Sequence, residues 1–100
     1  MAEPDGITVL RNDDRNRYEA RRDGKVVGYV LYQLRPGQVV LVHTEIEPEF
    51  EGQGVGGVLA RETLDDIRAR GETVVPLCPF IAGYIERHPA YADLVSPAAG

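Results

Sequence analysis

The chain has 100 residues, of which 43% are hydrophobic and 27% charged, and its formal net charge is −5. This length and composition predict one small globular domain with a single core and argue against a second domain. A negative net charge argues against general nucleic-acid or anionic-membrane binding, because both depend on summed lysines and arginines. Cys78 is the only cysteine, so no internal disulfide is expected. The start of the chain lacks the basic and apolar regions of a signal peptide, and we therefore expect a cytoplasmic protein.

The first half of the chain is typical of short strands joined by tight turns. Strands are expected over residues 7–11, 17–22, 25–34 and 39–46, with a polar turn over residues 12–16. Asp23-Gly24 is a strong signal for a two-residue hairpin, and Pro36-Gly37 favours another tight turn. These turns predict an antiparallel meander.

In the second half of the chain, the pattern changes to helix, strand and helix. Residues 55–70 carry one apolar helical face and end at Gly71, a suitable helix terminator. A buried strand is expected over residues 73–77, and a helical crossover should place it parallel to the strand at 39–46. A second helix should start near Pro79, carry Phe80, Ile81, Tyr84 and Ile85 on one face, and stop before Pro89. One domain is expected over residues 7–95, with flexible ends at residues 1–6 and 96–100.

The segment between the strand at 39–46 and the first helix is rich in glycine, reading Glu51-Gly52-Gln53-Gly54-Val55-Gly56-Gly57. Glycines let the main chain approach a ligand closely, and the first turn of the following helix offers free amides and a positive dipole end. This pattern predicts an anion site, in particular one for phosphate. A glycine-rich helix entry that binds nothing is the alternative, although each glycine inside the helix costs about 1 kcal/mol relative to alanine.

Two familiar phosphate loops fit this segment poorly. A P-loop needs Gly-Lys-Ser/Thr at its end, whereas Val58-Leu59 follows the glycines here. The glycine spacing satisfies the dinucleotide fingerprint, and Glu72 lies at about the right distance for a ribose-binding acid. However, Glu47–Glu51 separate the strand from the first glycine, and too little chain remains for a doubly wound sheet.

The motif Glu51-x-x-Gly54-x-Gly56, between a strand and an amphipathic helix, resembles the pyrophosphate-binding motif of the GNAT acetyltransferases. Three further segments resemble the small stand-alone members of that superfamily: His43-Thr44-Glu45, Pro76-x-Cys78-Pro79-Phe80-Ile81 and His88-Pro89-x-Tyr91. The resemblance covers residues 18–94. It implies a minimal GNAT-like α+β fold, with a mostly antiparallel mixed sheet, one splayed parallel strand pair and two helices.

The resemblance also implies that the chain binds acetyl-CoA, and no metal is expected. Ile46 would offer backbone partners to the pantetheine arm, and the pyrophosphate would be surrounded by Gln53, Gly54, Val55, Gly56 and Gly57. Tyr84, Arg87 and His88 would meet the nucleotide end. The chain departs from the family pattern twice: Glu51 stands where Gln or Arg is usual, and Ile85 takes the place of a tyrosine that serves many relatives as a general acid.

Acetyl transfer to an amine needs a base that deprotonates the amine and a group that stabilises or protonates the departing thiolate. His43 and Glu45 should share one strand face, so either could be the base; the alternative is a packed histidine and a solvated glutamate. Cys78 ends a strand and precedes a helix, a position that favours thiolate. It could form an acetyl-cysteine intermediate, act as the acid, or be a small buried core residue.

The expected function is an acetyl-CoA-dependent N-acetyltransferase that transfers an acetyl group to a small amine or a protein lysine. A non-catalytic acyl-CoA-binding or regulatory module is the main alternative, and a partner-binding domain that uses its exposed sheet edge is the third. The acceptor site should be open, because only a short turn separates the first two strands. We expect a monomer or a weak homodimer.

Overall fold

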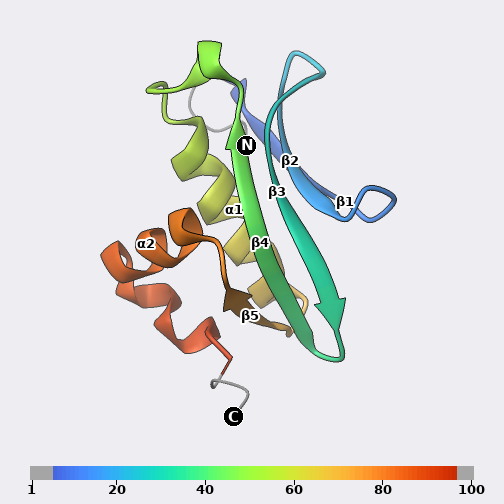
Figure 1. Ribbon diagram of the computed structural model, residues 1–100, viewed down its shortest axis with the longest axis vertical. Helices are drawn as coiled ribbons and strands as arrows, with labels where there is room; N and C mark the ends of the chain where they lie inside the picture. Colours follow the sequence, from blue (N-terminus) through green and yellow to red (C-terminus); the bar gives the residue numbers. More distant parts are fainter. Residues whose placement is uncertain (1–5, 97–100) are drawn as a thin grey trace.

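The computed structural model describes residues 6–96, and over that range it contains a five-stranded sheet with helices packed against it (Figure 1). The strands lie side by side in sequence order: β1 Thr8–Asn12, β2 Arg17–Arg22, β3 Lys25–Arg35, β4 Gln38–Ile46 and β5 Thr73–Pro76. Neighbours from β1 to β4 are antiparallel, whereas β4 and β5 are parallel. Helix α1 Val55–Ala69 connects these parallel strands, and α2 Pro79–Arg87 follows β5. Short 3-10 helices are η2 Pro48–Phe50 and η3 Pro89–Leu94. The predicted α+β class and mixed sheet are confirmed.

The tight turns follow the local chemistry of the sequence. Asp23 and Gly24 both have positive φ, at 52° and 79°, as a two-residue hairpin of type I′ requires. Gly37 has a φ of 70° in the turn between β3 and β4. Most strand and helix ends lie within a residue of the predicted ones, and β1 is shifted by one residue because Asn12 still pairs with Arg17 across the turn.

Helix α1 ends in a Schellman motif at the predicted glycine. The amide of Gly71, which has a φ of 72°, donates to the Arg68 carbonyl at 3.0 Å, and the Glu72 amide donates to the Ile67 carbonyl at 3.1 Å. The buried face of the helix contains Val55, Val58, Leu59, Ala60, Thr63, Leu64 and Ile67. This face covers one side of the sheet, as the apolar periodicity predicted.

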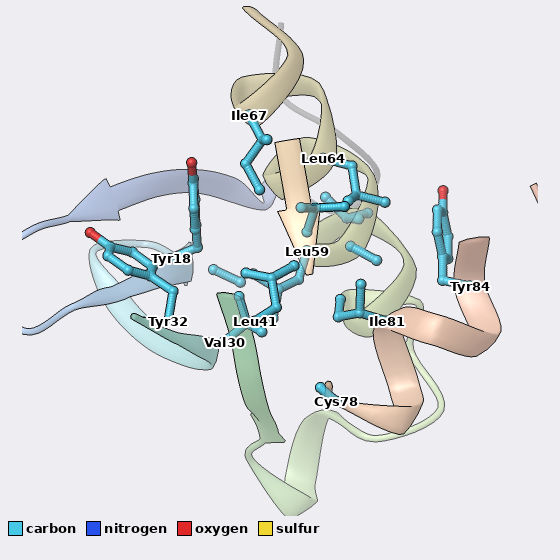
Figure 2. Close-up of a cluster of buried hydrophobic side chains, with 14 of the residues drawn as sticks. Tyr18, Val30, Tyr32, Leu41, Leu59, Leu64, Ile67, Cys78, Ile81 and Tyr84 are labelled. Atoms are coloured by element: carbon cyan, nitrogen blue, oxygen red, sulfur yellow. The ribbon is translucent and has the colours of Figure 1, made fainter. Parts of the chain in front are cut away.

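One cluster of buried side chains joins the sheet to both helices. In Figure 2, Tyr18 and Tyr32 of the sheet lie at one end of the cluster, and Ile81 and Tyr84 of α2 lie at the other. Leu59 lies between these ends, and Leu59 and Ile81 are both fully buried. Because α1 and α2 share this core, the start of each helix has a fixed position relative to β4.

The parallel strands separate before β4 ends. Pairing stops at Leu41 and Pro76, where the amides of Leu77 and Cys78 both donate to the Leu41 carbonyl at 3.0 Å. β4 then continues for five residues, to Ile46, beyond its last partner on β5. The chain passes from there through η2 to α1, at the upper end of the molecule in Figure 1. The predicted splay therefore leaves one edge of β4 available beside the glycine-rich segment.

The predicted flexible ends at 1–6 and 96–100 lie outside the described residues, apart from Gly6 and Ser96. The Ser96 amide donates to the Val74 carbonyl at 2.8 Å, and its hydroxyl accepts from the Gln38 side chain at 2.6 Å. Among residues 6–96, none of the helices has the length and apolar character needed to cross a membrane.

Candidate active site

A cavity of about 400 Å³ opens where β4 separates from β5. β4 supplies Thr44, Glu45 and Ile46 to its lining, and the glycine-rich segment supplies most of the rest. Phe50 and Phe80 add two aromatic rings. The cavity is thus bounded by an unpaired strand edge on one side and by the start of α1 on the other.

The amides at the start of α1 have no partner in the helical ladder. The first helical hydrogen bond runs from the Val58 amide to the Gly54 carbonyl at 3.2 Å, so the four amides of residues 54–57 precede the helical ladder. No side chain caps this helix, and its first turn carries no acidic residue. The positive end of the helix dipole therefore meets no acidic residue within the first turn of α1, which favours an anion.

Glycine has a different role at Gly54 and at Gly57. Gly54 has a φ of 84°, so a side chain there would strain the backbone even in open space. Gly57 is helical, and a Cβ built on it would meet nothing within 4 Å. The fold itself does not require glycine at position 57, although glycine weakens the helix there by about 1 kcal/mol.

A second cavity, of about 430 Å³, lies on the other side of the same glycines. Gly54, Gly57 and Phe80 line both cavities, and the second adds Arg61 and three residues of the α2 region, Tyr84, Arg87 and His88. The rings of Tyr84 and His88 are stacked, with centroids 4.0 Å apart, and burial raises the pKa of Tyr84 above its ordinary value. Two arginines and a stacked aromatic pair suit a phosphate and a planar base.

His43 and Glu45 lie on one face of β4, as the strand period predicted. The His43 Nε2 atom is 2.6 Å from Glu45 Oε1, and both side chains are more than half exposed. An exposed imidazole paired with a carboxylate can accept a proton and keep the resulting charge stabilised. This pair can therefore serve a reaction on the open face of the sheet.

Cys78 is the N-cap residue of α2 and is only 3% exposed. Its Sγ atom lies 3.1 Å from the hydroxyl of Thr44, which lines the first cavity. Because side chains alternate along a strand, Thr44 and Cys78 lie on the face of β4 opposite to His43 and Glu45. The two pairs thus extend from opposite faces of β4, although Glu45 also lines the first cavity. Figure 2 shows Cys78 at the edge of the buried cluster.

Two of the predicted positions differ from expectation. The Gln53 side chain lies outside the lining of both cavities, donates to the Glu49 carbonyl at 3.0 Å and accepts from Arg22 at 3.4 Å. Phe80 was expected on one face of α2 with Ile81, yet it is 38% exposed, because in the first helical turn its ring extends over Gly56 of α1 instead of into the core. The remaining predicted cofactor residues all line one cavity or both.

Sequence reasoning did not single out Thr44, Phe50, Phe80 and Arg61 as site residues. Arg61 lies four residues after Gly57 on α1, a spacing that places both on one helix face. That spacing could have identified it. Thr44 and Phe80 carry no such local signal, because their roles depend on how β4 and α2 meet. Among the described residues, no group of three or more histidine, cysteine, aspartate or glutamate side chains could hold a metal ion.

Known proteins are similar to this chain in sequence and in fold. Its sequence is 30% identical over 89 residues to the uncharacterized N-acetyltransferase YjhQ of Escherichia coli, and the alignment covers 81% of this chain and 46% of that protein. The chain therefore spans about half the length of the curated relative it matches. Its fold matches a GCN5-like protein from Staphylococcus aureus with a TM-score of 0.68 and 18% identity, covering 94% of this chain and 91% of the other. A ribosomal-protein-alanine N-acetyltransferase from Brucella melitensis matches with a TM-score of 0.53 and 20% identity, covering 84% and 63%.

Residues 17–94 match the family described as GCN5-related N-acetyl-transferase, which agrees with the motif at Glu51–Gly56 and with the separated parallel strands that lie beside it. This chain belongs to the GCN5-related N-acetyltransferase family.

Proposed function

We propose that this protein is an acetyl-CoA-dependent N-acetyltransferase that transfers an acetyl group to an amine. The observation that carries the proposal is the row of four uncapped amides at residues 54–57, which lies where two cavities meet. A ligand that fits this arrangement is anionic at its centre, with an extended arm on one side and a nucleotide on the other. Acetyl-CoA has this form.

The two cavities differ in the chemistry they offer to such a ligand. The first lies along the unpaired edge of β4, where Ile46 backbone groups could bind the amides of the pantetheine arm. The second holds Arg61 and Arg87 for phosphate charge, and the stacked Tyr84 and His88 rings for adenine. Glu51 lines the first cavity and opposes an anion by up to about 1 kcal/mol, so we expect modest affinity.

In the proposed reaction, the neutral amine attacks the thioester carbonyl carbon, a C–N bond forms and the C–S bond breaks. The amine loses a proton, which His43 accepts directly or through water while Glu45 stabilises the imidazolium. The departing CoA thiolate gains a proton. Cys78, hydrogen-bonded with Thr44 beside the first cavity, is our candidate for this donor or, alternatively, for a nucleophile that carries the acetyl group first.

The acceptor would approach the open face of the sheet, which carries His43 and Glu45. A net charge of −5 and this exposed glutamate favour a cationic amine, either a small amine or a lysine side chain. Proximity then contributes to the rate, because the amine and thioester are held on either side of one strand edge.

The test has two stages. Calorimetric titration should give saturable binding of acetyl-CoA and CoA, and much weaker binding of adenosine, which lacks the pyrophosphate. An amine panel with detection of released thiol should then give turnover with at least one cationic amine. Binding without turnover on any amine would support the non-catalytic acyl-CoA-binding alternative, and absence of binding would contradict both.

A further inference from the structure

Phe80 occupies an unusual place in the molecule. It lines both cavities, and the only other residues that the two linings share are the glycines Gly54 and Gly57. Its side chain is 38% exposed, so part of the ring surface can contact a ligand in either cavity.

The ring lies against the bare Cα of Gly56. A Cβ built at Gly56 would lie 2.8 Å from the Cζ atom of Phe80 and 3.4 and 3.6 Å from its Cε atoms. At the next position, a Cβ on Gly57 would meet nothing within 4 Å. Two consecutive glycines in one helical turn therefore have different partners: the space at Gly56 is filled by Phe80, and the space at Gly57 is open to a ligand.

We propose that Phe80, seated on Gly56, is a specificity-determining residue whose ring divides the cofactor groove into an arm compartment and a nucleotide compartment. This inference rests on the proposed function and extends it. A ligand that spans both compartments has to bend around the ring, and the bend falls at the row of amides of residues 54–57. The ring thus selects a molecule in which an anionic pyrophosphate joins an apolar arm to a nucleotide, over a molecule that fits one compartment alone.

The geometry also shows how to displace the ring without disrupting the fold. The atom closest to the missing Cβ is the tip of the Phe80 side chain, which can rotate, and not backbone. Alanine at position 56 should therefore push the ring into one compartment. Removing the ring should merge the two compartments, so both changes should impair a ligand that uses both.

A double-mutant cycle with acetyl-CoA as the probe tests the proposal. Gly56→Ala and Phe80→Ala should each weaken binding about tenfold. The double variant should be no weaker than Phe80→Ala alone, because no ring remains to be displaced. Gly57→Ala is the matched control, and it should change the Kd by the same factor with and without the ring. Losses at positions 56 and 80 that multiply to about 100-fold would overturn the proposal, because Gly56 would then serve the ligand directly.

Two more measurements separate a dividing role from simple packing. Phe80→Ala should weaken the binding of acetyl-CoA more than the binding of adenosine 3′,5′-bisphosphate, which needs only the nucleotide compartment. Equal losses of affinity would contradict the proposal.

Gly56→Ala should raise the Tm by about 4 °C in the Phe80→Ala background, where helix propensity acts alone, and should raise it less in the wild type. Wild-type protein that fails to bind acetyl-CoA would overturn this proposal together with the proposed function, whereas wild-type binding with multiplicative losses would overturn this proposal alone.

Discussion

The polar groups near the two ends of α1 differ in whether they have hydrogen-bond partners within the chain. Near its C-terminal end, the Tyr18 hydroxyl donates to Asp66 at 2.6 Å and Arg70 donates to the same carboxylate at 2.7 Å. Arg11, whose side chain is 7% exposed, donates to Glu72 at 3.1 Å and to Asp13 at 2.9 Å. At its N-terminal end, the amides of residues 54–57 precede the helical ladder and no side chain caps them.

On the function proposed above, this difference separates polar groups that stabilise the fold from groups that bind a ligand. A hydrogen bond between two groups of the chain stabilises the fold, and this stabilisation is lost when either residue is replaced. We propose that the row of uncapped amides at residues 54–57, beside a glycine that the fold does not require, binds a partner from outside the chain. Changes in the first region should therefore alter stability and leave binding intact, and changes in the second should do the reverse.

The largest expected effect comes from a charge placed among the free amides. Gly57→Asp adds an acid to the first turn of α1, where it interacts favourably with the helix dipole, so the free energy of unfolding should not fall. The same charge should repel the pyrophosphate and weaken acetyl-CoA binding by about 3 kcal/mol, more than 100-fold. Gly57→Asn is the neutral control of matched size. Equal affinities of the two variants for acetyl-CoA, measured by calorimetry, would mean that no phosphate lies there.

The pair on the open face of β4 should affect turnover and leave cofactor binding unchanged. His43→Gln removes the proton acceptor and should lower kcat/KM about 100-fold, and Glu45→Gln should have a smaller effect. The pH profile of kcat/KM in the wild type should contain an ascending limb that stays fixed when acceptor amines of different basicity are compared. If both variants keep the wild-type rates and pH profiles, neither residue is the base, and the amine loses its proton to solvent.

On β2, Glu19 also has its hydrogen-bond partners within the chain, and it should be important for stability alone. It is 1% exposed, and although burial by itself would raise its pKa, hydrogen bonds from Arg21, Arg17 and Asn12 outweigh burial and lower the pKa below its ordinary value. Glu19→Gln should lower the free energy of unfolding by about 2 kcal/mol at neutral pH.

The pH dependence of that effect has a definite sign. A carboxyl whose pKa is lower in the folded state stabilises the fold above its unfolded pKa, so the difference from wild type should be full above pH 4.5 and should shrink as the pH falls through the folded value. Urea unfolding from pH 3 to 7 would measure it. A difference that grows in acid, or a loss of acetyl-CoA affinity in a folded variant, would break the distinction between the two regions.

The smallest effect is expected at the Tyr18 hydroxyl. Tyr18→Phe keeps the buried ring and removes only the bond to Asp66, which Arg70 continues to neutralise. The free energy of unfolding should fall by about 1 kcal/mol. Chemical denaturation would detect this change, and Tyr32→Phe, which removes the bond to Asp13, offers a comparison at a turn. No change in either variant would mean that these bonds add nothing to stability.

Much of the fold could be predicted from local patterns. The hairpin at Asp23-Gly24, the end of α1 at Gly71 and the parallel placement of β5 each follow from chemistry within a few residues or from the handedness of the crossover. The uncapped start of α1 after a glycine-rich segment could also be predicted from local sequence, whereas its binding of a phosphate stays a prediction.

The parts of the site that were missed depend on contacts between distant elements. Phe80 looked like a core residue of α2, and only the proximity of Gly56, 24 positions earlier in the sequence, explains why its ring remains exposed. The predicted catalytic residues lie on the expected elements, His43 and Glu45 on β4 and Cys78 at the start of α2. Their positions on opposite faces of β4 were not predicted from the sequence. That separation depends on how the start of α2 packs against Thr44.

The central claim is that the amides of residues 54–57 bind the pyrophosphate of acetyl-CoA. A titration of 15N-labelled protein with acetyl-CoA, followed by two-dimensional amide NMR spectra, tests it at those atoms. We predict that the amide signals of Gly54, Val55, Gly56 and Gly57 shift most, that CoA reproduces the shifts, and that adenosine does not. Unchanged signals at these four positions, with or without shifts elsewhere in the protein, would contradict the claim.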